Sequence, residues 1–153
     1  MKIDEILNTK FTSPQQKALI NIRYTSNFLI HYQNGFMAEY NITIPQFNIL
    51  RILRGAKGEL NVNTVKERMI EKSPNTTRLM DKLLAKDLIN RINCQADRRV
   101  VYVSITQAGL DLLAQIDVKM RESVMHPKGI TDEEAETLSF LLDKLRNDFI
   151  ENH

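Results

Sequence analysis

The chain of 153 residues contains a single cysteine, Cys94, and has no tryptophan, four prolines and five glycines. A lone cysteine cannot form an internal disulfide, and the N-terminus lacks the pattern of a secretory signal, so a cytoplasmic protein is expected. No apolar run approaches the roughly 18 residues that a membrane span needs. His31, His126 and His153 lie far apart in the sequence, and no metal site is therefore expected.

The motifs of common enzyme classes are missing as well. The chain contains no nucleophile elbow, no phosphate-binding loop and no paired-carboxylate motif. The sequence therefore predicts a protein that is not an enzyme and that needs no cofactor. The 42% apolar and 26% charged residues are ordinary for a globular protein, and the length suits one domain with its own core.

The charged residues are unevenly distributed along the chain. Residues 1–50 contain four basic and three acidic side chains, residues 51–106 contain twelve and six, and residues 107–153 contain five and ten. A basic middle segment is typical of a surface that faces a polyanion such as nucleic acid. Solvated helix faces would give a similar distribution, so the charge alone does not decide between the two interpretations.

Capping residues and apolar spacing predict six helices. Ser13, Thr43 and Thr131 are each followed three residues later by Gln or Glu, which is the spacing of a capping box, and Ser73 is followed by Pro74. The tight connection at residues 71–72 between two short helices is typical of a helix-turn-helix. The predicted helices cover residues 13–39, 43–55 (ended by Gly55), 61–70, 73–86, 107–125 and 131–150, and a short strand is considered at Leu60.

Residues 88–106 have the pattern of a β-hairpin. The runs LINRINC (88–94) and VVYVSIT (100–106) are rich in β-branched residues and flank a polar tip with two arginines. In the second run Val103 and its neighbours two residues away fall on one face, and Thr106 is placed to cap the next helix. A basic hairpin after a helix-turn-helix predicts a wing. The expected fold class is therefore mainly α (α+β), a winged helix-turn-helix with a two-stranded β wing, flanked by N- and C-terminal helices.

Four short strings resemble one known family when they are taken in order and at this spacing. TRLMDKL (77–83), LINR (88–91), DRR (97–99) and ITQAG (105–109) closely resemble the MarR family of bacterial transcriptional regulators. Each string by itself is weak, and the resemblance rests on their order. Together with the order of the predicted helices, it covers about residues 13–150.

The resemblance implies an obligate homodimer of a single MarR-like domain over residues 1–153. Residues 43–106 would form the winged helix-turn-helix lobe, and residues 13–40 and 107–150 would form the dimerisation helices. The implied function is transcription regulation, as a repressor that binds a pseudo-palindromic operator in double-stranded DNA. The alternative is a winged-helix module that binds a partner protein, although such a module has no need of a basic wing tip.

The first residues of the predicted helix over 73–86 are candidates for reading DNA bases, because the major groove admits one helix by its N-terminal end. Asn pairs with adenine and Arg with guanine, while Thr offers a hydroxyl and a methyl group. Leu79, Met80, Leu83 and Leu84 are expected to be buried, which leaves Asn75, Thr76, Arg78 and Lys82 on other faces. The base-reading candidates are Asn75, Thr76, Thr77 and Arg78, and the phosphate-contacting candidates are Ser73 and Lys82.

The tip of the predicted wing carries Asp97, Arg98 and Arg99. Asp97 and Arg99 are two residues apart, so on a strand-like tip the carboxylate would orient the guanidinium. Arg99 would then enter the minor groove, where the negative potential attracts it, and Arg98 would contact a phosphate. The alternative is a solvated surface ion pair worth at most about 1 kcal/mol.

Members of the resembled family often respond to small phenolic or other amphipathic anions. The residues that are placed to line such a pocket are Phe28, His31, Tyr32, Phe47 and Arg51, and ordinary core or dimer packing is the alternative for each. A ligand acts on such a dimer only through different affinities for its DNA-competent and DNA-incompetent states.

The chain departs from the family pattern before and within the wing. Asp87 stands where the family often has glycine, and a different helix end is expected there because Asp adopts the left-handed conformation less readily than Gly. The residues Gln95 and Ala96 replace a segment in which proline is common. Cys94 alternates with Ile92, which predicts an inward-facing and unreactive thiol.

Overall fold

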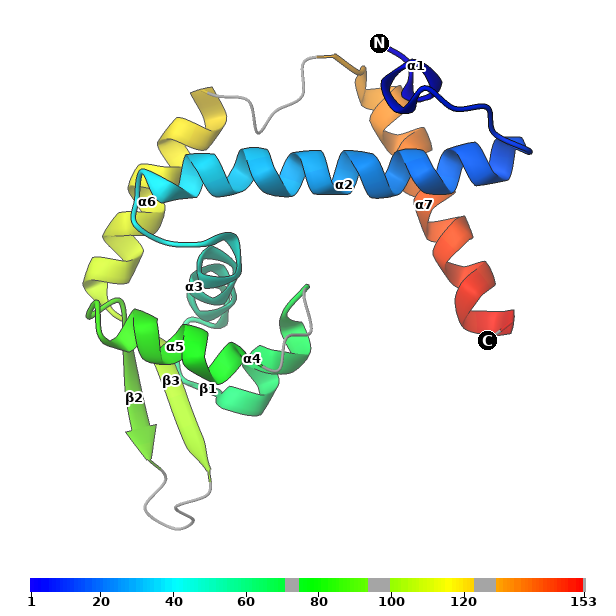
Figure 1. Cartoon of the computed structure of the whole chain (residues 1–153). Helices are drawn as coiled ribbons and strands as arrows, with labels where there is room; N and C mark the ends of the chain where they lie inside the picture. The colour runs from blue at the N-terminus through cyan, green and yellow to red at the C-terminus, as the bar shows by residue number, and fades with distance from the viewer. Residues whose placement is uncertain (71–74, 94–99, 123–128, 153) are drawn as a thin grey trace. The chain divides into compact units, whose positions relative to one another are not determined.

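The computed structural model describes residues 1–70, 75–93, 100–122 and 129–152 of the chain (Figure 1). By contacts, the chain divides into two compact units, Met1–Ala114 and Gln115–His153. The described residues are mainly helical with one small antiparallel sheet, as the sequence predicts. Among the described helices, none combines the length and the apolar character that crossing a membrane requires.

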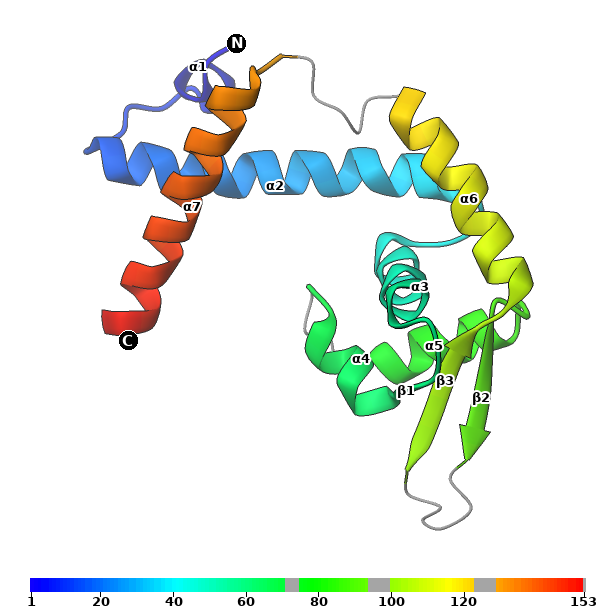
Figure 2. The ribbon, with the colours of Figure 1, turned by 180° about the vertical axis from the view of Figure 1, so that it is seen from behind.

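The first unit contains most of the secondary structure (Figures 1 and 2). Both views show α3 between α2 and α5, with the β2–β3 hairpin projecting beyond α4 and α5. Its elements are α1 (Ile3–Leu7), α2 (Pro14–Ala38), α3 (Ile44–Ala56), β1 (Leu60–Asn61), α4 (Val62–Arg68), α5 (Thr76–Leu84), β2 (Ile89–Asn93), β3 (Val101–Ile105) and the first half of α6 (Gln107–Glu122).

Capping interactions fix the starts of α2 and α3 where the sequence predicts them. The Ser13 hydroxyl accepts a hydrogen bond from the Gln16 backbone N–H at 3.1 Å. At α3 the Thr43 hydroxyl accepts from the Gln46 N–H at 3.4 Å, and the Gln46 side chain accepts from the Thr43 N–H at 3.0 Å. These bonds satisfy N–H groups that have no partner within the helix, and one such cap contributes about 1 kcal/mol.

The sheet has three strands in the order β1-β3-β2. The β2–β3 pairing sets Ile89 opposite Ile105 and Asn93 opposite Val101, which confirms the predicted hairpin. The very short β1 adds a third strand on the other side of β3, with Leu60 opposite Val103. Val103 is buried, whereas Val101 and Ile105 on the same face are half-buried.

The core of the winged lobe combines residues of α3 with residues from most of the helices and strands around it. On α3 the apolar positions recur at helical spacing, so Ile49, Leu50 and Leu53 all point inward and are fully buried. Val65 of α4, Leu83 of α5, Ile89 of β2, Val103 of β3 and Leu113 of α6 are also among the buried residues. This shared core fixes α5 and the base of the hairpin on one scaffold.

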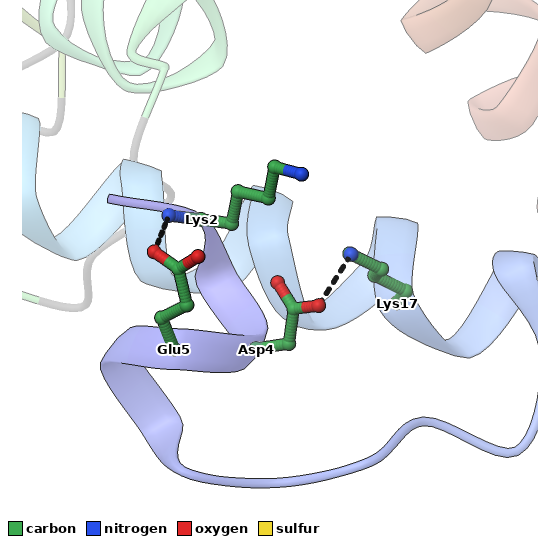
Figure 3. A network of polar contacts seen from close by, with 4 residues as sticks. All are labelled: Lys2, Asp4, Glu5 and Lys17. Carbon is green, nitrogen blue, oxygen red and sulfur yellow. Dashed lines mark hydrogen bonds and ion pairs between the residues drawn. The ribbon is translucent and has the colours of Figure 1, made fainter.

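A short N-terminal helix, α1, was not predicted from the sequence. The backbone N–H of Lys2 donates to the Glu5 carboxylate at 2.9 Å, and the Asp4 carboxylate forms an ion pair with Lys17 of α2 at 3.1 Å (Figure 3). The hydrogen bond from Lys17 is the main reason that the pKa of Asp4 lies below its ordinary value. Ile3 is buried, so α1 is held by an apolar side chain as well as by this exposed ion pair.

The long helices bury little of their apolar surface. In α2, which has 25 residues, only Met37 is buried. In the second unit α7 (Asp132–Asn152) begins with the predicted capping box of Thr131 and Glu134 and has no buried residue. The exposed large apolar side chains include Leu19, Ile22, Phe28, Leu29 and Ile30 on α2, and Leu138, Phe140, Leu141, Phe149 and Ile150 on α7.

Several predicted boundaries need correction. The helix α3 ends at Ala56, one residue beyond the end predicted at Gly55, and Lys57 with a φ of 54° is its left-handed cap. The helix α4 ends at Arg68 instead of residue 70, because Met69 already has extended backbone. The helix α5 starts at Thr76, three residues after the predicted cap at Ser73, which lies outside the described residues.

Candidate nucleic-acid interface

The helix α5 has one buried face and one exposed face. Thr76 is only 1% exposed, so the prediction that it lies on an outer face with Asn75 and Arg78 is wrong. The reason is spacing, because Thr76 precedes Met80 by four residues and Leu83 by seven, and all three point into the core. Thr76 is therefore removed from the candidates for base contact.

The remaining candidates of α5 are exposed. Thr77, Arg78 and Lys82 lie on the outer surface, and Asn75 is the exposed residue directly before the helix. Thr77 shares a face with Asp81, and Arg78 shares the neighbouring face with Lys82, because residues four apart are neighbours on a helix. The outer surface of α5 thus presents two cations beside a hydroxyl and a carboxylate.

An ion pair connects α5 with the hairpin. The guanidinium of Arg91 on β2 lies 3.1 Å from the carboxylate of Asp81. The two side chains are 41% and 54% exposed, so this pair contributes at most about 1 kcal/mol to stability. It borders a cleft of about 180 Å³ whose other lining residues include Lys66 of α4 and Thr77. Asp81 and Arg91 entered the sequence-based predictions only within the strings TRLMDKL and LINR, and their pairing was not predicted.

The tip of the wing lies outside the described residues. This holds for Asp97, Arg98 and Arg99, and also for Cys94, Gln95 and Ala96. The inward-facing Cys94 was expected from its alternation with Ile92, and Ile92 is 40% exposed; Cys94 itself lies outside the described residues. The described register of β2 and β3 sets the strand ends, Asn93 and Val101, opposite each other, so the tip connects two paired strands.

The five residues considered for an effector pocket do not share one environment. Phe47 is buried in the core of the lobe, which agrees with the packing alternative. The guanidinium carbon of Arg51 lies 5.7 Å from the centroid of the Phe47 ring. Phe28, His31 and Tyr32 are exposed on α2. Arg51 also borders an open hollow of about 300 Å³ together with Asn48, Ile52, Arg68 and Ile70. The described residues include no group of three or more His, Cys, Asp or Glu side chains placed to hold a metal ion.

A sequence model of a known family matches residues 32–116, more than half of the chain, and its description is transcriptional regulator SarA/Rot. The chain belongs to the SarA/Rot family of transcriptional regulators. The match spans the end of α2, the whole winged lobe and the first part of α6. Because regulators of transcription act by binding and not by chemistry, this membership agrees with the missing enzyme motifs.

Solved structures place this SarA/Rot member in the MarR-like winged-helix fold, as the sequence predicts. A putative MarR-like regulator from Bacillus cereus is 22% identical with a TM-score of 0.75, and the match covers 88% of this chain and 96% of that one. A mutant of MarR from Escherichia coli in complex with operator DNA is 24% identical (TM-score 0.67; 84% and 93% covered). An organohalide-sensing regulator, RdhR, bound to 2,4-dichlorophenol is 20% identical (TM-score 0.77; 92% and 88% covered).

Proposed function

We propose that the chain is a homodimeric, sequence-specific DNA-binding regulator that acts as a repressor and is released by a small-molecule effector. The observation that carries the proposal is the outer face of α5, where Thr77, Arg78 and Lys82 are exposed while Thr76, Met80 and Leu83 anchor the opposite face. A short helix held this way presents its first turns to a groove. Family membership supports this interpretation, and so does the operator-bound structure of Escherichia coli MarR.

In this proposal α5 reads the major groove. Arg78 contacts guanine, Asn75 and Thr77 contact neighbouring base edges, and Lys82 and Ser73 contact phosphates that fix the register without reading sequence. From the wing, Arg99 enters the minor groove with its orientation set by Asp97, and Arg98 contacts a phosphate. Residues 43–106 form the DNA-binding lobe of a single domain.

The dimer follows from the uncovered apolar surface of the long helices. Large apolar side chains are exposed along α2 and, separately, along α7, and exposed apolar patches commonly mark surfaces that bind another protein. A second copy of the chain would cover residues 13–40 and 107–150 and would place two lobes on the two halves of a pseudo-palindromic operator.

The effector in this proposal is a small amphipathic or phenolic anion. The observation in its favour is that a structural relative, the organohalide-sensing RdhR, was solved with 2,4-dichlorophenol bound. Arg51 supplies a cation, and Phe28, His31 and Tyr32 supply exposed aromatic surface. Phe47 acts through its stacking contact with Arg51. Release of the operator requires tighter binding of the anion to the DNA-incompetent state.

Fluorescence anisotropy with a labelled duplex from the region upstream of the gene tests the proposal. Arg78→Ala should lower the affinity about 5- to 150-fold, the equivalent of roughly 1–3 kcal/mol for one bidentate base contact. Arg99→Ala should weaken binding as well. Lys82→Ala should weaken binding to all duplexes alike and should reduce the slope of log K against log salt by about 1. Lys10→Ala removes the same charge outside the lobe and serves as the matched control.

A scrambled duplex separates sequence reading from general attraction to polyanions. Tight binding that prefers the upstream duplex, is sensitive to salt and is weakened by Arg78→Ala supports the proposal. Equally weak binding of several candidate operators and the scrambled duplex, unchanged by Arg78→Ala, contradicts it. That result favours a winged-helix module that binds a partner protein.

A further inference from the structure

The C-terminal end of α5 is closed by a tight backbone turn. The Leu88 N–H donates to the Leu83 carbonyl at 3.1 Å and the Asp87 N–H to the Leu84 carbonyl at 3.0 Å, while Asp87 has a φ of 55°. This is a Schellman motif with aspartate in the left-handed position that glycine usually occupies. The expectation that Asp87 would change the helix end is therefore wrong, because the two hydrogen bonds hold the left-handed conformation.

Thr106, the cap of α6, binds directly to this turn. Its backbone N–H donates to the Leu88 carbonyl at 3.1 Å, and its hydroxyl donates to the Asp87 carbonyl at 2.7 Å. The same hydroxyl accepts from the Gly109 N–H at 3.1 Å, which is the predicted cap of α6. One threonine side chain thus joins the last turn of α5 to the first turn of α6.

Gly109 permits the close approach of the two helices. A Cβ atom at this position would lie 2.4 Å from the Leu88 carbonyl oxygen and 2.7 Å from Cγ1 of Ile105. Because the first of these neighbours is backbone, a larger residue would push the start of α6 away from the end of α5. Glycine is needed here for space, and not for an unusual backbone angle.

The same end of α5 is also held from α2. The Lys86 ammonium donates a hydrogen bond to the Asn41 carbonyl in the connection between α2 and α3. Asn41 itself has a φ of 55°, and the Ile42 N–H donates to the carbonyl of the buried Met37 at 3.3 Å, so α2 ends in a closed turn as well. Lys86 therefore connects two rigid helix ends.

We propose that Lys86, Thr106 and Gly109 are positioning residues that fix the angle of α5 to α2 and α6 and so set the half-site spacing that the dimer accepts. We call the contacts of these residues with Asn41, Asp87 and Leu88 the α5 anchor. The inference rests on the proposed dimeric DNA-binding function. The α5 anchor holds α5 by its C-terminal end, while Thr77 and Arg78 lie at the other end.

The length of α5 makes its reading end sensitive to the α5 anchor. From Thr77 to Leu84, the last helical residue, α5 rises about 10.5 Å at 1.5 Å per residue. A tilt of about 10° at the α5 anchor therefore moves the reading end by about 1.8 Å, which is about half of the 3.4 Å rise of one base pair. Because α2 and α6 belong to the proposed dimerisation helices, the α5 anchor relates each reading end to the dimer axis.

The test measures how affinity depends on the spacing between half-sites. The probe is the duplex that the wild-type protein enriches from a random-sequence library, together with duplexes in which one or two base pairs are inserted or deleted at its centre. The variants are Thr106→Val, which keeps the shape without the hydroxyl, and Lys86→Met, which keeps the stem without the donor. Thr106→Ser retains both hydrogen bonds and is the matched control.

The wild type and Thr106→Ser should lose about tenfold or more in affinity for each changed base pair. Thr106→Val and Lys86→Met should flatten this dependence to about threefold or less while binding the parent duplex less tightly. A variant that weakens binding to every spacing by one common factor has a merely structural effect and overturns the inference. A wild-type protein that enriches no sequence contradicts the proposed function instead.

Amide hydrogen exchange without DNA tests the α5 anchor independently of the proposed function. Thr106→Val should speed exchange at Leu88 and at Gly109 together, because both amides belong to the joined turns, and should leave the α3 core unchanged. Unchanged exchange at both sites overturns the α5 anchor whatever the DNA experiment shows. Gly109→Ala, which separates the same turns by a backbone clash, should produce the same pattern in those chains that fold.

Discussion

The winged lobe buries many of its residues, whereas the long helices leave nearly all of theirs exposed or half-buried. The 13 residues of α3 include six that are buried, whereas the 25 residues of α2 include one and the 21 residues of α7 include none. The lobe thus forms a core from its own helices and strands. The long helices keep their apolar side chains in water until another surface covers them, and in our proposal that surface belongs to a second copy of the chain.

The largest expected effect is the loss of folding stability when a cavity is made in the core of the winged lobe. Leu50→Ala should lower the free energy of unfolding by about 2–5 kcal/mol, because Leu50 is 0% exposed and the lost side chain leaves a cavity. Urea denaturation followed by circular dichroism measures the loss. Leu141→Ala on α7 is the matched control, since Leu141 is 53% exposed. The loss of stability caused by Leu141→Ala should depend on protein concentration, as expected for a contact between protomers.

Equal and concentration-independent losses from Leu50→Ala and Leu141→Ala would contradict the contrast between the two regions. Such a result would mean that α7 contributes to the stability of a single chain as much as the core does.

A smaller effect is expected when the capping threonine hydroxyl is removed from one helix of each region. Thr43→Ala should destabilise the chain by about 1 kcal/mol, because α3 is part of the cooperative core. Thr131→Ala removes the corresponding hydroxyl from α7, whose residues are not buried, and should change only the helix content near its start. Thermal unfolding measures the effect of Thr43→Ala, and residue-level hydrogen exchange measures the effect of Thr131→Ala. Serine at either position should restore the wild-type behaviour, and a loss that persists with serine argues against capping.

The smallest effect concerns α1. The pKa of Asp4 is lowered in the folded chain, so the contact with Lys17 is present above the ordinary pKa of aspartate and is lost as the pH falls through the lowered value. The Lys17 side-chain resonances in NMR should report this loss below about pH 4. Asp4→Asn should remove the pH dependence with little change in stability, because both side chains are 40% exposed. If the pH response of the Lys17 resonances persists in Asp4→Asn, that response is caused by another carboxylate.

The sequence predicts those features that depend on neighbours along the chain. The caps at Ser13, Thr43 and Thr131 and the two strands of the hairpin follow from local spacing and are confirmed. The burial of Thr76 also had a local signal, its spacing from Met80 and Leu83, which was overlooked because threonine is polar. Such a side chain is judged better by the face it occupies than by its type.

Features that depend on contacts distant in sequence escaped prediction. The Thr106 hydroxyl, nineteen residues after Asp87, donates to the Asp87 carbonyl and so joins two helix ends that local spacing does not bring together. Arg91 and Asp81 meet only because β2 folds back along α5. The roles proposed for Arg78, Lys82 and the wing tip remain predictions, because each role is a contact with a DNA groove or a phosphate.

The order of the sheet has a consequence for aggregation. With β3 in the centre, β2 is an edge strand whose free backbone groups offer a template to the hairpin of another molecule. The strand is only five residues long, and its four exposed residues are the polar Asn90 and Asn93, the charged Arg91 and the apolar Ile92. A short polar edge with a positive charge disfavours strand pairing between molecules. The same arginine that contacts α5 thus also disfavours pairing of this edge with the hairpin of another molecule.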